Sequence, residues 1–203
     1  MTDEIVRRFK KGEIIIFPTD TVYGIGCIIS NEKTIKRLHE LRNDPPNKPT
    51  LILATDETQA FKYGIFNKAA RKLAQNFWPG PLTIVVKAKE NVPKIIRGGD
   101  GTIAIRVPNQ PPILNIIKQI GEPILAPSAN FHYELPPASF TEIDKRLISL
   151  VDYSVDLSQL KNAAAMTDTP STLVSVIEEV IKIIRPGAIA LEDLEKALEE
   201  PRR

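Results

Sequence analysis

The sequence predicts an α+β fold, in which helices cover a mixed β-sheet. Short β-branched segments such as EIIIF (13–17) and LTIVVKA (82–88) mix with amphipathic helical segments, without the strict strand–helix order of a parallel sheet. Only three residues separate STLVSV (171–176) from VIKIIR (180–185), which predicts a hairpin and therefore an antiparallel pair. No repeat or change of composition divides the chain, so we expect one domain over residues 1–203.

In the first half of the chain, Thr2 is expected to cap a helix that ends at Gly12. An apolar stripe along NEKTIKRLHELRN (31–43) predicts a second helix, and Ser30 is expected to cap it. That stripe comprises Ile35, Leu38 and Leu41. The remaining elements predicted here are strands at 13–17, 21–29 and 50–54 and helical segments at 55–64 and 67–78.

In the second half, apolar β-branched runs again predict strands and apolar stripes predict helices. The strands are expected at 82–88, 102–107, 123–126, 151–156, 171–176 and 180–185, and the helices at 111–121, 139–150 and 191–200. The 17 prolines fall in short groups such as Pro136-Pro137, not in a linker-like tract. We therefore interpret them as rigid loop corners inside one domain.

Composition excludes several classes of protein. The chain has 27 Lys and Arg against 25 Asp and Glu, a balance that does not by itself indicate a nucleic-acid-binding protein. Its single cysteine, Cys27, allows no internal disulfide and no thiolate zinc site, and we expect a buried, inert thiol. No apolar run approaches the ~20 residues that span a bilayer, and the N-terminal segment is charged throughout. We therefore expect a cytoplasmic protein that does not enter membranes.

The usual nucleotide and metal motifs are absent from the sequence. There is no GxxxxGK[ST] phosphate loop, and GIG (24–26) lacks the third glycine of a dinucleotide site. RGGDG (97–101) is interpreted as a turn before a strand, with phosphate binding as the alternative. The two histidines form no metal-ligand pattern: His39 is expected on a helix surface and His132 in a loop.

Polar residues instead gather where predicted strands end. These groups are PTDT (18–21), RVP (106–108), PSAN (127–130), PST (170–172) and RPG (185–187). Arg106 and Arg185 could converge on one anion, because guanidinium groups suit carboxylates and phosphates. The hydroxyls and the Asn130 amide would then supply neutral hydrogen bonds to a small polar ligand. Each residue alone is better explained as a cap or turn residue, but together they predict a cleft for a small anion.

In their order and spacing, these motifs resemble the YrdC family, whose members include threonylcarbamoyl-AMP synthases. The resemblance extends from about residue 10 to 190 and rests on FPTDTVYGIG, KPTLIL, FWPGPLTIVVKA, TIAIRVPN, GEPILAPSAN, PPAS, PSTLV and IIRPGAI. It implies a YrdC/RibB-like twisted mixed sheet with helices on its faces and a concave, basic pocket. It also implies a reaction in which L-threonine, bicarbonate and ATP, with Mg²⁺, give threonylcarbamoyl-adenylate and pyrophosphate.

The resemblance further implies partners and site residues. A downstream transferase complex would move the threonylcarbamoyl group to tRNA, and family members are associated with double-stranded RNA binding. Arg106, Arg185 and Asn130 are expected to be catalytic, with no resident metal ligand among the side chains. The residues expected to bind substrates are Thr19, Thr21, Tyr23, Arg42, Lys48, Ser128, Ser171 and Thr172.

Three loops depart from the family pattern. Where the family usually has Lys-x-Arg, this chain reads Arg42-Asn43-Asp44, so a negative charge replaces a positive one. The loop FHYELPP (131–137) is longer than expected, and Asp156-Leu157-Ser158 replaces an Asp-Gly-Gly turn. A carboxylate ~4 Å from a phosphate would cost about 1–4 kcal/mol per unit charge. The alternative reading is a divergent relative that binds a nucleotide or RNA without making the adenylate.

Overall fold

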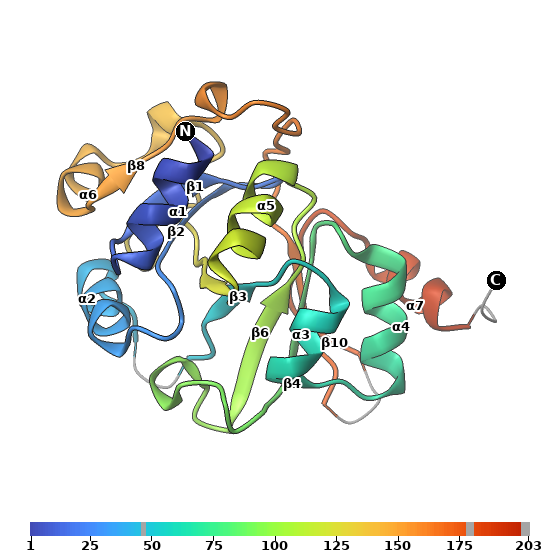
Figure 1. Ribbon diagram of the computed structural model, residues 1–203. Helices are drawn as coiled ribbons and strands as arrows, with labels where there is room; N and C mark the ends of the chain where they lie inside the picture. The colour runs from blue at the N-terminus through green and yellow to red at the C-terminus, as the bar shows by residue number, and fades with distance from the viewer. Residues whose placement is uncertain (46–47, 178–180, 200–203) are drawn as a thin grey trace.

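The computed structural model describes residues 1–45, 48–177 and 181–199, and it contains the mixed sheet that the sequence predicts (Figure 1). Its strands are β1 (Ile15–Pro18), β2 (Tyr23–Gly26), β3 (Leu51–Leu53), β4 (Gly64–Ile65), β5 (Leu82–Ala88), β6 (Thr102–Arg106), β7 (Ile124–Leu125), β8 (Tyr153–Ser154), β9 (Thr172–Ser175) and β10 (Lys182–Arg185). Its α-helices are α1 (Thr2–Lys10), α2 (Glu32–Arg42), α3 (Glu57–Tyr63), α4 (Lys68–Phe77), α5 (Pro111–Ile120), α6 (Lys145–Leu150) and α7 (Leu191–Glu199).

The larger sheet has the strand order β10-β9-β5-β6-β3-β7, and β4 also pairs with β5. Strand β5 runs antiparallel to β6 and parallel to β9, and β3 runs parallel to β6, so the sheet is mixed. Strands β9 and β10 are antiparallel, which confirms the predicted pair. The turn between them, residues 178–180, lies outside the described residues. A smaller sheet has the order β2-β1-β8.

The two sheets meet at Gly26 in β2. Cys27 accepts a backbone hydrogen bond from Leu125 in β7 (2.8 Å), and the Pro127 carbonyl accepts one from Ile25 (2.9 Å). A Cβ atom at Gly26 would lie 1.7 Å from the Leu125 carbonyl oxygen, so only glycine permits this approach. The second glycine of GIG therefore joins the sheets and brings the segment after β1 beside the segment after β7.

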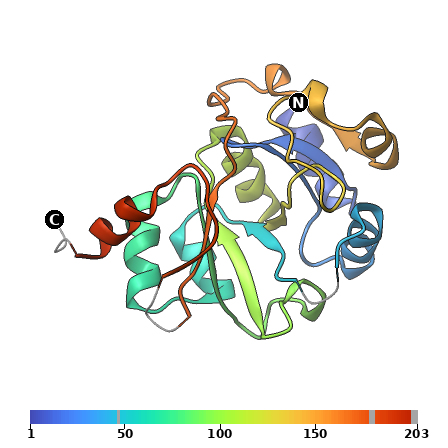
Figure 2. The same cartoon turned by 180° about the vertical axis from the view of Figure 1, so that it is seen from behind.

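Helices cover one face of the larger sheet and leave its other face open. In Figure 1, α3, α4 and α5 lie in front of this sheet, and Figure 2 shows β6 from the opposite side with the helices behind it. The alternation of a β-strand accounts for the division. Ile84 and Ile105 point into the core beneath the helices, whereas Thr83, Ala104 and Arg106 line a cavity on the other face.

Two hydrophobic clusters hold this arrangement. In one, Ile5 and Phe9 of α1 pack with Ile113 and Ile117 of α5 against the smaller sheet. The other fills the space between the larger sheet and α2, α3, α4 and α7, and it contains the fully buried Cys27 that the sequence predicts. Burial raises the pKa of the Cys27 thiol to about 12, with a smaller contribution from Glu122.

Two predicted helix caps are wrong. Met1, not Thr2, is the N-cap of α1, and it makes no side-chain capping bond. Asn31 caps α2 by accepting a hydrogen bond from the Thr34 amide (3.1 Å). The hydroxyl of Ser30 donates to the Glu122 carboxylate instead (2.7 Å). Because Asn and Ser cap equally well, the adjacent pair did not reveal which residue begins the helix.

The predicted helix at 139–150 is also wrong as a single element. It is divided into a 3₁₀ helix at Phe140–Glu142 and helix α6, because Ile143 is extended and Asp144 caps α6 through the Arg146 amide. Short 3₁₀ helices also occur at Lys94–Ile96 and Leu157–Gln159. Of the predicted C-terminal helix, residue 200 lies outside the described residues. No helix within the described ranges is both long and apolar enough to cross a bilayer.

Candidate functional site

A cavity of about 410 Å³ opens on the helix-free face of the larger sheet. It collects side chains from the last residues of β6 and β10 and from the segments that follow β1 and β7. Nine of the residues predicted from sequence line it: Thr19, Thr21, Tyr23, Arg42, Lys48, Arg106, Ser128, Ser171 and Arg185. Four of these are cationic, and Asp44 is the one acidic residue among the described lining residues. The predicted concave, basic pocket is therefore present.

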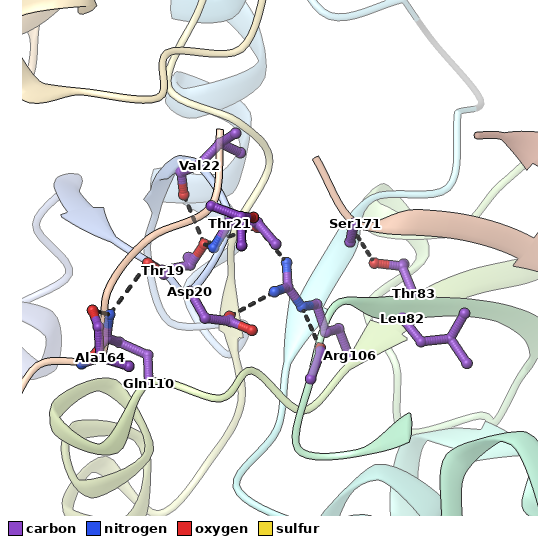
Figure 3. Close-up of polar contacts among 12 residues, drawn as sticks. Thr19, Asp20, Thr21, Val22, Leu82, Thr83, Arg106, Gln110, Ala164 and Ser171 are labelled. Atoms are coloured by element: carbon purple, nitrogen blue, oxygen red, sulfur yellow. Dashed lines mark hydrogen bonds and ion pairs between the residues drawn. The ribbon is translucent and has the colours of Figure 1, made fainter. Parts of the chain in front are cut away.

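One set of lining residues and their supports, which we call the strand-end cluster, is built around Arg106. It comprises Thr19, Asp20, Thr21, Arg106, Ser171 and Arg185. Arg106 is 3% exposed, and its guanidinium donates to the Asp20 carboxylate (2.5 Å), the Thr21 hydroxyl (2.8 Å) and the Gly80 carbonyl (2.9 Å) (Figure 3). Burial lowers the pKa of Arg106, and the charge of Asp20 opposes that shift. The negative charge of Asp20 therefore reduces the energetic cost of burying the Arg106 guanidinium.

The threonines of PTDT are held mainly by their own turn. The Thr19 hydroxyl donates to the Val22 carbonyl (2.7 Å) and accepts from the Thr21 amide (3.1 Å). Gln110 donates from its amide to the Thr19 carbonyl (3.2 Å), which fixes the turn against α5 (Figure 3). Both hydroxyls nevertheless line the cavity, so capping and ligand contact are compatible at this turn.

Arg185 reaches the same cavity from the end of β10. Its guanidinium donates to the carbonyl oxygen (2.9 Å) and the hydroxyl (3.3 Å) of Ser171. Figure 3 shows the bond between the Ser171 hydroxyl and Thr83 (2.8 Å). Burial lowers the pKa of Arg185, and so does the nearby charge of Arg106. No carboxylate in the described part of the chain forms an ion pair with Arg185. Its positive charge is therefore available to an anionic ligand.

A second set of residues, the Asp44 cluster, comprises His39, Arg42, Asp44 and His132. Arg42 donates to the Asp44 carboxylate (3.1 Å) and to the backbone carbonyls of Ser128 and Asn130 (2.8 Å to Asn130). His39 Nδ1 lies 3.0 Å from the same carboxylate, and His132 Nδ1 lies 3.8 Å away. Burial raises the pKa of Asp44, but the hydrogen bond from His39 and the charge of Arg42 outweigh it and keep the pKa below its ordinary value.

The turn after α2 creates this cluster. Asn43 has a left-handed backbone (φ 56°), and the Asp44 amide donates back to the His39 carbonyl (3.0 Å). The turn therefore places Asp44 beside α2, the helix that precedes it. The expectation that His39 is a surface residue is wrong, because its ring lines the cavity and is held by Asp44.

Two predicted site residues do not line the cavity. The Thr172 side chain is fully buried, and its hydroxyl donates to the Ile189 carbonyl and accepts from the Ile189 amide (both 2.8 Å). Thr172 thus joins the PST and RPG segments, where a Cβ on Gly187 would lie 2.3 Å from the Pro170 carbonyl oxygen. In this placement the Thr172 hydroxyl bonds the backbone of Ile189 and supports the site from behind the cavity wall.

Asn130 also lies outside the lining residues and has a positioning geometry. Its amide donates to the carbonyls of Phe131 (2.8 Å) and Glu134 (2.9 Å), which holds the loop after PSAN. Its side-chain oxygen is buried without a hydrogen-bond partner. Tyr23 remains at the wall, with its hydroxyl accepting from the Leu157 amide (3.0 Å). Burial raises the pKa of Tyr23, so this hydroxyl stays protonated.

Sequence reasoning missed Asp20, Thr83 and His39 as parts of the site. Asp20 sits inside the PTDT motif, and its position between two threonines predicted to bind a ligand was the available signal. Thr83 is a polar residue at an alternate position of an otherwise apolar strand, which indicates a second, less apolar face. No sequence signal marked His39, since a helical histidine is ordinary on a surface.

The sequence pattern of the Sua5/YciO/YrdC family, described as telomere recombination, matches residues 7–187. The chain belongs to this family. A relative from Methanocaldococcus jannaschii is 34% identical over 93% of this chain and 86% of its own length. A protein from Pyrococcus abyssi named threonylcarbamoyl-AMP synthase is 32% identical over 95% of this chain, which spans 56% of that protein.

Solved structures of the Sua5/YciO/YrdC family share the fold. The crystal structure of P. abyssi Sua5 complexed with L-threonine superposes with a TM-score of 0.88 at 31% identity, covering 99% of this chain and 58% of the other. Escherichia coli YciO has a TM-score of 0.84 at 24% identity, covering 95% of this chain and 92% of the other. The chain therefore spans little more than half of the P. abyssi proteins but nearly all of YciO.

Proposed function

We propose that this protein is a threonylcarbamoyl-AMP synthase, a nucleotidyltransferase that joins L-threonine, bicarbonate and the adenylyl group of ATP and releases water and pyrophosphate. The observation that carries the proposal is the pair Arg106 and Arg185, which converge on one cavity while only Arg106 has a described carboxylate partner. A site with unneutralised guanidinium charge suits an anionic substrate. The P. abyssi relatives support the choice, since one is named for this activity and another was solved with L-threonine.

The strand-end cluster would bind the reacting anions. In the proposed step, a carbamate oxygen attacks the α-phosphorus, and the bond from that phosphorus to the pyrophosphate oxygen breaks. Such a displacement depends on positioning and on relief of negative charge, more than on an acid–base pair. Arg185 would neutralise charge on the carbamate or phosphate, with Thr21 and Ser171 as neutral donors beside it.

Mg²⁺ would enter with ATP as part of the substrate. The described residues contain no group of three or more His, Cys, Asp or Glu side chains placed to hold a metal. The two carboxylates of the site, Asp20 and Asp44, are already paired with Arg106 and Arg42. The side chains present therefore do not form a resident Mg²⁺ site, and we assign no step to the metal.

The product would pass to a downstream threonylcarbamoyl transferase complex that modifies tRNA. A mixed anhydride of a carbamate and a phosphate is prone to hydrolysis, which favours prompt transfer in the cytoplasm. Direct contact with tRNA or double-stranded RNA would use exposed cations such as Lys48 at the cavity rim. These partners are proposals that follow from the reaction.

The test is pyrophosphate release from MgATP, measured with and without L-threonine and bicarbonate. We expect release only when both are present, with L-serine much less effective if the methyl group of threonine is bound. Pyrophosphate release that does not depend on threonine and bicarbonate would contradict the proposed synthase activity.

Asp44 favours one second candidate, a family member that binds a nucleotide or RNA without forming the adenylate. Its carboxylate stands at the cavity where the family pattern has a cation. MgATP binding without pyrophosphate release would support that candidate. RNA binding would be recognised by a steep loss of affinity as salt rises.

A further inference from the structure

Thr83 and Ser171 share a hydrogen bond on the cavity side of the larger sheet. Leu82 and Ile84 of β5 point into the core, so Thr83 between them points to the opposite face. Thr83 pairs with Leu173 of β9, and Ser171, two residues earlier, lies on the same face. Both Thr83 and Ser171 line the cavity, with their hydroxyl oxygens 2.8 Å apart (Figure 3).

Thr83 is connected to the charged groups of the site through Ser171. Within the described part of the chain, the Thr83 hydroxyl bonds to the Ser171 hydroxyl alone, and Thr83 is 1% exposed. Ser171 also accepts two hydrogen bonds from the Arg185 guanidinium, at its hydroxyl (3.3 Å) and at its carbonyl oxygen (2.9 Å). Ser171 therefore links Thr83 to the cation that has no described carboxylate partner.

The direction of the bond between the two hydroxyls decides what Ser171 can offer a ligand. A hydroxyl has one proton to donate and two lone pairs that accept, and Arg185 occupies one lone pair of Ser171 Oγ. If Ser171 donates to Thr83, it has no proton left for a ligand, and its remaining lone pair repels an anion. If Thr83 donates instead, both lone pairs are occupied and the Ser171 proton is free for an anion in the cavity.

We propose that Thr83 is a positioning residue, whose hydroxyl donates to Ser171 Oγ when an anion binds. This bond directs the Ser171 proton toward a phosphate oxygen and fixes the side chain that anchors Arg185. Thr83 itself does not contact the ligand. The inference rests on the proposed function, because the phosphate belongs to its substrate ATP or its product pyrophosphate.

Two other roles for Thr83 predict different results. If Thr83 contacted the ligand independently, the losses from removing the Thr83 and Ser171 hydroxyls would multiply. If Thr83 only supported the sheet, its removal would lower stability and leave the affinity of the folded protein unchanged. A residue that acts through Ser171 affects the ligand only while the Ser171 hydroxyl is present.

The chain offers matched variants for this test. Thr83→Val keeps the shape of the side chain and removes the hydroxyl, whereas Thr83→Ser keeps the hydroxyl. Thr34→Val is the control for the loss of a buried threonine hydroxyl. That hydroxyl donates to the Gly12 carbonyl (2.8 Å) from helix α2, and Thr34 does not line the cavity.

The experiment measures the dissociation constant of inorganic pyrophosphate by calorimetry for the wild-type protein and these variants, and for Ser171→Ala with and without Thr83→Val. We expect Thr83→Val to weaken binding about fivefold in the wild-type background and to have no further effect in Ser171→Ala. Thr83→Ser and Thr34→Val should bind within about twofold of the wild-type protein. Losses that multiply in the double variant, or unchanged affinity in Thr83→Val, would overturn the inference.

Two further results separate this inference from the proposed function. A wild-type protein that does not bind pyrophosphate would overturn the inference, because no anion would then reach Ser171. A wild-type protein that binds pyrophosphate but releases none from MgATP, L-threonine and bicarbonate would overturn the proposed function, while the binding cycle would still decide the role of Thr83. If Thr83→Val fails to fold, Thr83→Ala and Thr83→Ser differ only in the hydroxyl and repeat the comparison.

Discussion

Arg106 and Arg42 are both buried arginines paired with an aspartate beside the same cavity, yet their surroundings differ. Arg106 pairs with Asp20, and a second guanidinium, Arg185, stands nearby without a described carboxylate partner. Arg42 pairs with Asp44, and the additional groups there are imidazoles. The strand-end cluster therefore keeps an unbalanced positive charge at the cavity, whereas the charge of Arg42 in the Asp44 cluster is balanced by Asp44.

The comparison shows that an arginine beside a cavity is not thereby identified as a ligand contact. An arginine at a cavity can be a ligand contact, or it can be a clamp for backbone carbonyls, as Arg42 is for Ser128 and Asn130. What decides is the set of partners that the fold brings to it. The following variants separate these uses.

The largest expected effect is on stability, from removing the partner of the more buried arginine. Asp20→Asn leaves Arg106, which is 3% exposed, without its counter-charge, and we expect it to lower the free energy of unfolding by about 3–5 kcal/mol. Asp44→Asn should cost only about 1–2 kcal/mol, because Arg42 keeps its two backbone acceptors. Urea unfolding at pH 7 measures both, and equal losses would erase the distinction between the clusters.

The pH dependence of Asp44→Asn adds a check of sign. The folded-state pKa of Asp44 is lowered, so its carboxylate adds stability above its unfolded-state pKa of about 4, and this stability is lost as the pH falls through the folded-state value. The difference between Asp44→Asn and the wild-type protein should therefore shrink in acid. A difference that grows as the pH falls would contradict the pairing.

The next effect is on turnover, from removing the unpaired guanidinium. Arg185→Ala should lower pyrophosphate release at least about 100-fold, because it deletes a positive charge that faces the developing anion. Stability should fall by only about 0.5–1.5 kcal/mol, since Arg185 has no ion-pair partner among the described residues and loses only its hydrogen bonds to Ser171. Lys182→Ala, an exposed cation on the same strand, is the control and should turn over normally. Normal turnover in Arg185→Ala would remove the strand-end cluster from the reaction.

The sequence predicts the strand-end cluster better than the Asp44 cluster for a physical reason. Arg106 and Arg185 end β6 and β10, which run in the same direction in the larger sheet, and Thr19 follows β1 of the smaller sheet, which meets the larger one at Gly26. A pattern of apolar runs followed by polar residues is therefore enough to group them. The predicted mixed sheet is confirmed, and the residues grouped on that basis line one cavity, whose binding of an anion stays a prediction.

The Asp44 cluster depends on a turn instead. Whether Asp44 faces a ligand or returns to its own helix is decided by the left-handed conformation of Asn43. Asn tolerates that conformation without requiring it, so the sequence does not determine the direction of the chain. The pairing of His39 with Asp44 could not be foreseen for the same reason, and the apparent loss of a cation at Asp44 became clear only from its partners.

The smallest expected effects distinguish two adjacent residues of the strand-end region. Ser171 lines the cavity beside Arg185, whereas the Thr172 hydroxyl serves the backbone of Ile189. Ser171→Ala should lower pyrophosphate release about tenfold, the loss of one hydrogen bond. It should also cost about 1 kcal/mol of stability, because the buried Thr83 hydroxyl loses its partner.

Thr172→Val should lower stability but leave turnover unchanged. It keeps the shape of the side chain but leaves the buried amide and carbonyl of Ile189 unpaired, which should cost about 1–2 kcal/mol of stability. Turnover per folded molecule should be unchanged, measured by pyrophosphate release after unfolding curves have set the folded fraction. If Thr172→Val reduced turnover while its stability was unaltered, the Thr172 hydroxyl would belong with the ligand after all. Thr172 would then have to be counted among the residues of the site and not among those that support it.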